Sequence, residues 1–206
     1  PDIDASTQHM FDQGHQIGEL AKSLFPDGID VPTDDFKENI EETKELMAKR
    51  KPLFEGGISV DGMFARPDIL NPVENDEWDI IEVKSSTSVK EVNVEDVAFQ
   101  KYVYEKAGLK IRKCFLMHIN NQYVKNGEID PNEFFVQEDI TEDVKSVVGI
   151  QERVSHSFAV INGPEPDVRI GRHCNDPYSC DLVEECWGFL PENGVDELCC
   201  GGKKTF

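Results

Sequence analysis

Three ionisable residues lie in two apolar segments at a spacing that suits a metal site. Asp68 lies in a short apolar segment, and Glu82-Val83-Lys84 ends a second one fourteen residues later. Because side chains alternate along a strand, Glu82 and Lys84 would share one side and Val83 would point to the other. Ionised groups in such strands are costly to bury unless they are paired or bind a metal. Two carboxylates beside a lysine therefore indicate a site for a hard cation such as Mg²⁺ or Mn²⁺.

Hydrolysis of a phosphodiester is the chemistry that fits this set of side chains. Asp68 and Glu82 would hold the cation, which polarises a phosphoryl oxygen and lowers the pKa of bound water. Lys84 would orient the attacking water and offset the charge that develops on the phosphate. The plainer alternative is a solvated strand pair with a surface salt bridge, because Glu-x-Lys alone is a common pattern.

The elements that would position these residues follow from hydrophobic periodicity and turn signals. Helical periodicity covers residues 7–25, 36–50 and 95–107, and Gly108 ends the last of these. Strands are expected within 58–65, 66–70, 78–84 and 110–119, with Asp61-Gly62 as a hairpin turn in the first. A last long helix is expected from Thr141 to about residue 157, and the chain after Gly163 reads as irregular.

Three further residues have spacings that suit a site. His15 falls at the rim of the apolar face of the first helix, a position that suits a residue facing a cleft. Gln100 and Tyr104 are four residues apart, so they share one helical face. Taken individually, His15 also fits a helix-surface histidine and Tyr104 a packed aromatic residue.

The ordered set of motifs resembles a known family. Asp68 with Glu82-Val83-Lys84 resembles the PD-(D/E)xK nuclease signature, and the segment from Gln100 to Tyr104 (QKYVY) resembles the Gln-xxx-Tyr motif of its RecB-like branch. His15 resembles the histidine in the N-terminal helix of the family, and the resemblance implies that it is an extra metal ligand.

The resemblance implies an α/β fold with a restriction-endonuclease-like core, in which helices flank a central mixed sheet. It also implies a metal-dependent exonuclease that cleaves linear DNA ends, with Gln100 and Tyr104 positioning the substrate strand. A catalytically silent nucleic-acid or protein-binding module with the same fold is the alternative, and a nuclease acting on RNA is a third.

The C-terminal part of the chain is rich in cysteine. Cys174, Cys180 and Cys186 are evenly spaced, and they resemble the three C-terminal ligands of a [4Fe–4S] cluster in CRISPR-associated RecB-like exonucleases. A four-thiolate cluster needs one more ligand, which we expect upstream of Pro1 in a longer parent protein. Zinc bound with the help of His173 and a segment without metal are the alternatives. We expect a nuclease core at 1–165 and a cysteine-rich segment at 166–206 that packs on it.

The remaining cysteines and the composition set wider limits. Cys114 reads as an ordinary buried thiol, and Cys199 and Cys200 as idle thiols or substitute ligands. The formal net charge of −20 is unusual for a nucleic-acid binder, although a carboxylate-rich metal site is acidic by nature. The 38% hydrophobic content supports a folded core, and no run is long enough to span a membrane. We therefore expect a cytoplasmic protein whose partners are DNA and other domains of its parent.

Overall fold

The structure, a computed structural model, describes residues 5–175, 179–191 and 194 and divides the chain into two compact units. The first unit is Pro1–Arg153 and the second is Val154–Phe206. The division falls within α6 (Ile150–Ile161), before the boundary at residue 165 that the sequence predicts. The packing of the cysteine-rich segment on the core stays a prediction.

A mixed sheet of six strands forms the centre of the first unit. The order across the sheet is β1 (Ile29–Asp30), β2 (Leu53–Phe54), β5 (Ile69–Pro72), β6 (Glu77–Lys84), β7 (Lys110–Ile119) and β8 (Phe135–Asp139). The pairs β1–β2 and β6–β7 are parallel, and the other neighbours are antiparallel. This arrangement confirms the predicted α/β class with a central mixed sheet.

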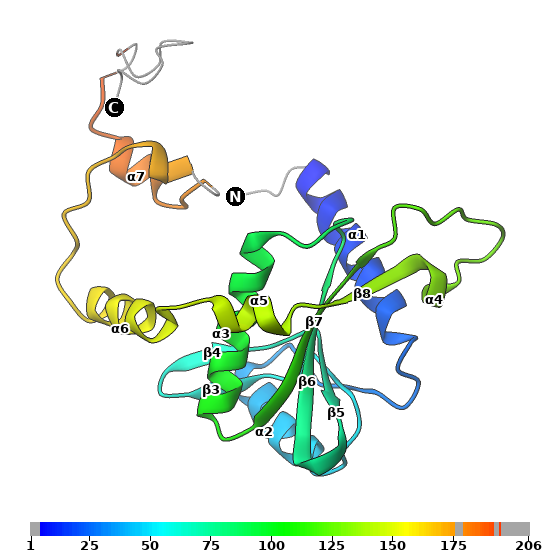
Figure 1. The fold of residues 1–206 in the computed structure, drawn as a ribbon. Helices are drawn as coiled ribbons and strands as arrows, with labels where there is room; N and C mark the ends of the chain where they lie inside the picture. The colour runs from blue at the N-terminus through cyan, green and yellow to red at the C-terminus, as the bar shows by residue number, and fades with distance from the viewer. Residues whose placement is uncertain (1–4, 176–178, 192–193, 195–206) are drawn as a thin grey trace. The chain divides into compact units, whose positions relative to one another are not determined.

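Helices cover both faces of this sheet, as predicted. Those of the first unit are α1 (Ala5–Lys22), α2 (Phe36–Met47), α3 (Glu91–Lys106), α4 (Pro131–Phe134), α5 (Thr141–Ser146) and the 3₁₀ turn η1 (Glu74–Asp76). Ile81 of β6 packs in an apolar cluster with Ala21 of α1, whereas the adjacent Glu82 accepts a hydrogen bond from Gln100 of α3. Because neighbouring strand residues point to opposite faces, α1 and α3 lie on opposite sides of the sheet, with β6 and β7 between them (Figure 1).

Two glycines at positive φ lie where the sequence predicts a turn and a helix end. Asp61 (φ 50°) and Gly62 (φ 78°) connect β3 (Ile58–Val60) to β4 (Met63–Ala65), and these angles are those of a two-residue hairpin turn. Gly108 (φ 96°) follows α3 in the left-handed conformation that ends many helices. Both predictions are confirmed.

The prediction of one long helix from Thr141 to about residue 157 is wrong. The chain forms α5 and then α6, and the break between them includes Val147 in extended conformation and Gly149 at φ 76°. A residue at positive φ cannot continue a right-handed helix, so the apolar periodicity on the two sides of the break belongs to separate helices. The strands β1, β2 and β8 were also missed, because they are short or carry several polar residues.

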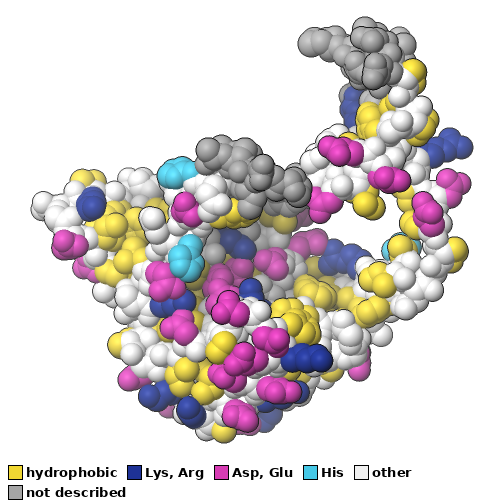
Figure 2. Space-filling model, turned by 180° about the vertical axis from the view of Figure 1, so that it is seen from behind, with side chains coloured by type: hydrophobic (Ala, Val, Ile, Leu, Met, Phe, Trp, Pro, Cys, Tyr) yellow, Lys and Arg dark blue, Asp and Glu magenta, His cyan; other side chains and the backbone are white. Residues whose placement is uncertain are grey.

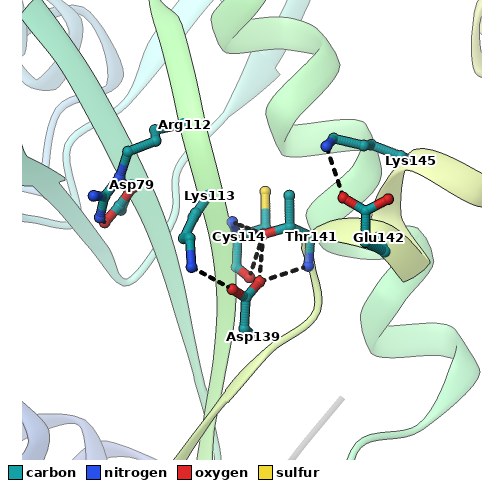
Figure 3. A network of polar contacts seen from close by, with 8 residues as sticks. All are labelled: Asp79, Arg112, Lys113, Cys114, Asp139, Thr141, Glu142 and Lys145. Atoms are coloured by element: carbon teal, nitrogen blue, oxygen red, sulfur yellow. Dashed lines mark hydrogen bonds and ion pairs between the residues drawn. The ribbon is translucent and has the colours of Figure 1, made fainter. Parts of the chain in front are cut away.

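A polar network joins β7, the end of β8 and the start of α5 (Figure 3). The Nζ atom of Lys113 lies 2.7 Å from Oδ2 of Asp139, and the hydroxyl of Thr141 donates to Oδ1 of Asp139 over 2.5 Å. The same hydroxyl accepts from the backbone N–H of Cys114 at 3.0 Å. Asp139 therefore links the edge of the sheet to the helix that follows it.

Replacement of Asp139 by asparagine should lower stability in a pH-dependent way. The hydrogen bonds from Lys113 and Thr141 lower the pKa of Asp139 to about 2, below the unfolded value of about 3.9. The carboxylate therefore contributes stability above the unfolded pKa, and this contribution is lost as the pH falls towards the folded pKa. Urea unfolding at pH 6 should show Asp139→Asn less stable than the parent, with a smaller difference at pH 2.5. A matched Glu142→Gln variant in an exposed ion pair should change little, and an Asp139→Asn deficit independent of pH would contradict the account.

The second unit has short helices and much irregular backbone, as the sequence predicts for the region after Gly163. It contains the end of α6, the 3₁₀ turn η2 (Arg172–Asn175) and α7 (Val183–Trp187). Among the helices that the structure describes, none is long and apolar enough to cross a membrane.

Candidate metal centre

Strand pairing brings Asp68 and Glu82 together. The antiparallel register pairs Ile69 of β5 with Ile81 of β6, so the residues just beyond this pair, Asp68 and Glu82, are neighbours. Oδ2 of Asp68 accepts a hydrogen bond of 2.6 Å from the backbone N–H of Val83, which fixes its position beside the end of β6. The two carboxylates that the sequence singles out thus lie side by side where the strands end.

Side-chain alternation also places Lys84 beside Glu82, as the sequence predicts. The Nζ atom of Lys84 lies 2.7 Å from Oε1 of Glu82, and the Nε2 atom of Gln100 donates to Oε2 over 3.0 Å. Val83 points the other way and packs against the apolar cluster on the α1 side. Glu82 is only 6% exposed, so these two partners are what make its burial tolerable.

Asp96 is a functional candidate that the sequence reasoning missed. Its Oδ2 atom lies 3.4 Å from Nζ of Lys84, and its Oδ1 atom lies 3.5 Å from Nε2 of Gln100. Lys84 and Gln100 therefore each lie between the same two carboxylates, those of Glu82 and Asp96. The signal was present in the sequence, because Asp96 precedes Gln100 by the four residues that also separate Gln100 from Tyr104.

The electrostatics of the site favour a bound cation. Burial, together with the charge of Glu82, raises the pKa of Asp68 well above its usual range. Burial alone would lower the pKa of Lys84, but the carboxylates of Glu82 and Asp96 outweigh this effect and raise it. Glu82 thus has a lysine partner in direct contact, whereas, within the described residues, the hydrogen bond to the Asp68 carboxylate comes from a backbone N–H. A divalent cation next to Asp68 would supply the missing positive charge.

Glu55 is a fourth carboxylate at the site, and like Asp96 it was missed. It is half-buried, and its burial raises the pKa of its carboxyl group. Its backbone N–H donates to the carbonyl of Asp68 at 3.1 Å, and its own carbonyl accepts from Nδ2 of the buried Asn39 at 2.9 Å. Its φ of 56° is unusual for a residue other than glycine. A two-residue strand and a left-handed residue leave no periodic pattern that sequence reasoning can detect.

Gln100 and Tyr104 share a face of α3 but contact different parts of the site. Gln100 bonds to Glu82 itself, whereas the hydroxyl of Tyr104 donates to the carbonyl of Gly56. Tyr104 is fully buried, and this burial raises the pKa of its hydroxyl. In this structure Tyr104 therefore fixes the backbone next to Glu55, and Gln100 fixes a carboxylate.

The two residues should consequently differ in their mutational effects. Gln100→Met removes a hydrogen bond from Glu82 and should weaken metal affinity about tenfold, as is usual when a partner of a ligand is lost. Tyr104→Phe should instead lower the free energy of unfolding by about 1–3 kcal/mol, because it leaves a buried carbonyl without its donor. Calorimetric Mn²⁺ titration and urea unfolding of both variants would separate the effects, and identical profiles would contradict the assignment.

A cavity of about 780 Å³ gives access to the site from the α1 side. Asp68, Val83 and Lys84 line it, and His15 lines it from α1. His15 is exposed. Across the described residues, no three histidine, cysteine, aspartate or glutamate side chains are gathered into a group that could hold a metal. His15 thus lines the same cavity as Asp68, and its part as an extra metal ligand stays a prediction.

The carboxylates present fit a magnesium-type site. Mg²⁺ keeps several waters and is commonly held by one or two carboxylates together with substrate phosphates, so a third protein ligand is not required. Asp68 and Glu82 would hold the cation, and among the described residues Asp68 forms no ion pair that the cation would have to replace.

The cysteines of the second unit do not form a gathered set among the described residues. Cys174 is buried, whereas Cys180 and Cys186 are exposed, although the backbone N–H of Cys180 donates to the carbonyl of Cys174 at 2.7 Å. Cys114 is a buried thiol in β7, and burial raises its pKa to about 12, which agrees with an ordinary core cysteine. Cys199 and Cys200 lie outside the described residues. The iron–sulfur or zinc site stays a prediction that depends on a further ligand.

No protein-family model matches the chain, and no curated protein matches it in sequence. The functional interpretation therefore depends on the residues and geometry described above.

Proposed function

We propose that this chain is a metal-dependent nuclease of the RecB-like type, with a restriction-endonuclease-like core, which hydrolyses DNA from its ends. The observation that carries the proposal is the placement of Asp68, Glu82 and Lys84. Asp68 and Glu82 lie side by side next to Lys84, and Asp68 and Lys84 line an accessible cavity. Within the described part of the chain, Asp68 forms no ion pair of its own. This is the arrangement expected of side chains that hold Mg²⁺ or Mn²⁺ next to a phosphate.

Each residue has a distinct part in the reaction. A bound cation would polarise the phosphate and lower the pKa of its water. Lys84 orients the attacking water and offsets charge on the phosphate, and Gln100 holds Glu82 in position. The water oxygen forms a bond to phosphorus while the bond to the leaving nucleotide oxygen breaks. A proton leaves the water to solvent, and the leaving oxygen takes one up.

The acidity of the chain shapes how it would bind DNA. Carboxylates are spread over much of the face drawn in Figure 2, with lysine and arginine among them, in keeping with the net charge of −20. Affinity for a phosphate backbone must then come from the bound cation and from the few cations at the site itself.

Digestion of matched DNA substrates tests the proposal. Chelator-treated protein, resupplied with Mg²⁺ or Mn²⁺, should degrade end-labelled linear DNA and spare a covalently closed circle of the same sequence. Digestion of both forms at the same rate would assign an endonuclease with the same metal chemistry. Metal binding without any hydrolysis would instead support the silent binding module, and preferential digestion of labelled RNA would change the substrate.

A further inference from the structure

The cations that line the cavity differ in how fully they are neutralised. The Nζ atom of Lys22 is bonded to Glu19 and Asp30, each at 2.6 Å. Lys84 lies between the two carboxylates described above. Within the described part of the chain, Arg66 forms a single ion pair, in which its Nε atom lies 3.0 Å from Oε2 of Glu55. A guanidinium has five N–H donors, so most of those of Arg66 are available to a ligand.

Hydrogen bonds from two side chains hold the backbone at Glu55 and at the residue after it. Asn39 binds the carbonyl of Glu55, and Tyr104 binds the carbonyl of the next residue, Gly56. Two buried polar side chains are thus used to fix one short segment. The carboxylate of Glu55 pairs with the Nε atom of Arg66, and within the described part of the chain no ion pair is formed by the two Nη groups of this arginine.

The position of Arg66 suits contact with a substrate. Arg66 is two residues before Asp68, and both line the cavity together with Glu55 and Lys84. The side chain of Arg66 is 37% exposed, so a ligand in the cavity can reach it. The Nη edge of arginine matches two phosphate oxygens, which makes it well suited to bind a phosphodiester in a fixed orientation.

We propose that Arg66 binds a backbone phosphate of the substrate strand and that Glu55 is the positioning residue that orients it. The proposal rests on the nuclease function and extends it, because it assigns a phosphate contact next to the metal centre. It also explains how so acidic a chain could hold a polyanion: the cavity needs a cation that is not already neutralised by two carboxylates.

Binding of strands with single neutral linkages tests this contact. The probe is fluorescein-labelled decathymidylate, with one methylphosphonate placed at each linkage in turn, titrated with the full chain in Ca²⁺. Arg66→Gln should weaken binding of the all-phosphate strand about tenfold. At the linkage that Arg66 contacts, the methylphosphonate should weaken binding to the parent protein. The same methylphosphonate should cause no further loss of binding to Arg66→Gln, because the arginine that pairs with this phosphate is already absent.

Three further variants make the outcome specific. Arg66→Lys should recover part of the affinity, and Glu55→Gln should reduce it while preserving some sensitivity at the same linkage. Lys44→Gln removes an exposed charge on α2 outside the cavity, and it should keep the parent pattern at every linkage. Parent-like affinity of Arg66→Gln, or undiminished sensitivity at every linkage, would overturn the proposal.

The result is distinguishable from failure of the nuclease function. If the linkage effect is found but Mg²⁺ supports no hydrolysis, the phosphate contact stands and the catalytic proposal fails. If the parent hydrolyses DNA but Arg66→Gln shows no loss, only the contact is wrong. A parent that binds no strand at all contradicts both.

Discussion

Replacement of Asp68 by asparagine should stabilise the metal-free protein and abolish metal-dependent cleavage. The folded protein raises the pKa of Asp68 well above its usual range, chiefly through burial, with the charge of Glu82 next. Asparagine retains an oxygen that can accept the N–H of Val83 but carries no charge to desolvate. At neutral pH the variant should therefore avoid the electrostatic cost that the parent bears.

The raised pKa of Asp68 determines how the stability difference between the variant and the parent depends on pH. Because the folded pKa of Asp68 is above the unfolded value of about 3.9, its contribution to stability is fully present below that value and is lost as the pH rises through the folded pKa. In chelator, the advantage of Asp68→Asn in urea unfolding should grow between pH 4 and pH 8. Glu128→Gln, a matched change at an exposed loop residue, should show no such trend. A variant that is less stable than the parent throughout this range would contradict the account.

Added metal should reverse the order of stability. A cation that binds only the folded state stabilises it by about 2.7 kcal/mol at one hundred times its dissociation constant. The parent should gain this stability in Mn²⁺, whereas Asp68→Asn should gain little. Equal stabilisation of both proteins would remove Asp68 from the ligand set.

Replacement of Lys84 by methionine should abolish cleavage while leaving metal affinity unchanged or higher. Lys84 is the cationic partner of the buried Glu82, so its removal leaves an uncompensated charge in the metal-free protein. Removing one partner of a buried ion pair costs about 3–5 kcal/mol of stability. Because the Lys84 side chain is 30% exposed and solvent screens the pair, we expect a cost at or below the lower end of this range. A bound cation then replaces the lost charge, and Glu82 no longer has to leave a lysine in order to bind it.

Measurements of metal affinity and hydrolysis on the same preparation distinguish the two effects. Lys84→Met should bind Mn²⁺ at least as tightly as the parent in calorimetry and should release no nucleotide from labelled DNA. Lys145→Met, which breaks an exposed ion pair on α5, should match the parent in both assays. Parent-like hydrolysis by Lys84→Met would rule out the proposed role of the lysine, and a large loss of metal affinity would make Lys84 structural.

The sequence predicted those parts of the site that depend on local periodicity. Alternation along β6 places Glu82 and Lys84 on one side and Val83 on the other, and the four-residue spacing in α3 places Gln100 and Tyr104 on one face. These relations depend on residues close in the chain, so the pattern is sufficient to predict them.

The parts that were missed depend on contacts between distant segments. Glu55 reaches the site because a two-residue strand pairs with β5, and its left-handed backbone is held by Asn39 and a carbonyl contact to Asp68. The sequence contains no local signal for such a contact. Asp96 is different, since its helical spacing from Gln100 was visible and only its reach to Lys84 required the structure.

The most direct test of the central claim is the release of nucleotide from end-labelled linear DNA by the parent and by Asp68→Asn, each stripped of metal and then resupplied with Mg²⁺. The account predicts hydrolysis by the parent only after Mg²⁺ is added, and none by the variant under any condition. Because the variant is expected to be the more stable protein without metal, its inactivity could not be attributed to unfolding. Metal-independent release by the parent, or equal release by a folded Asp68→Asn protein, would contradict the assignment of this site as a metal-dependent nuclease centre.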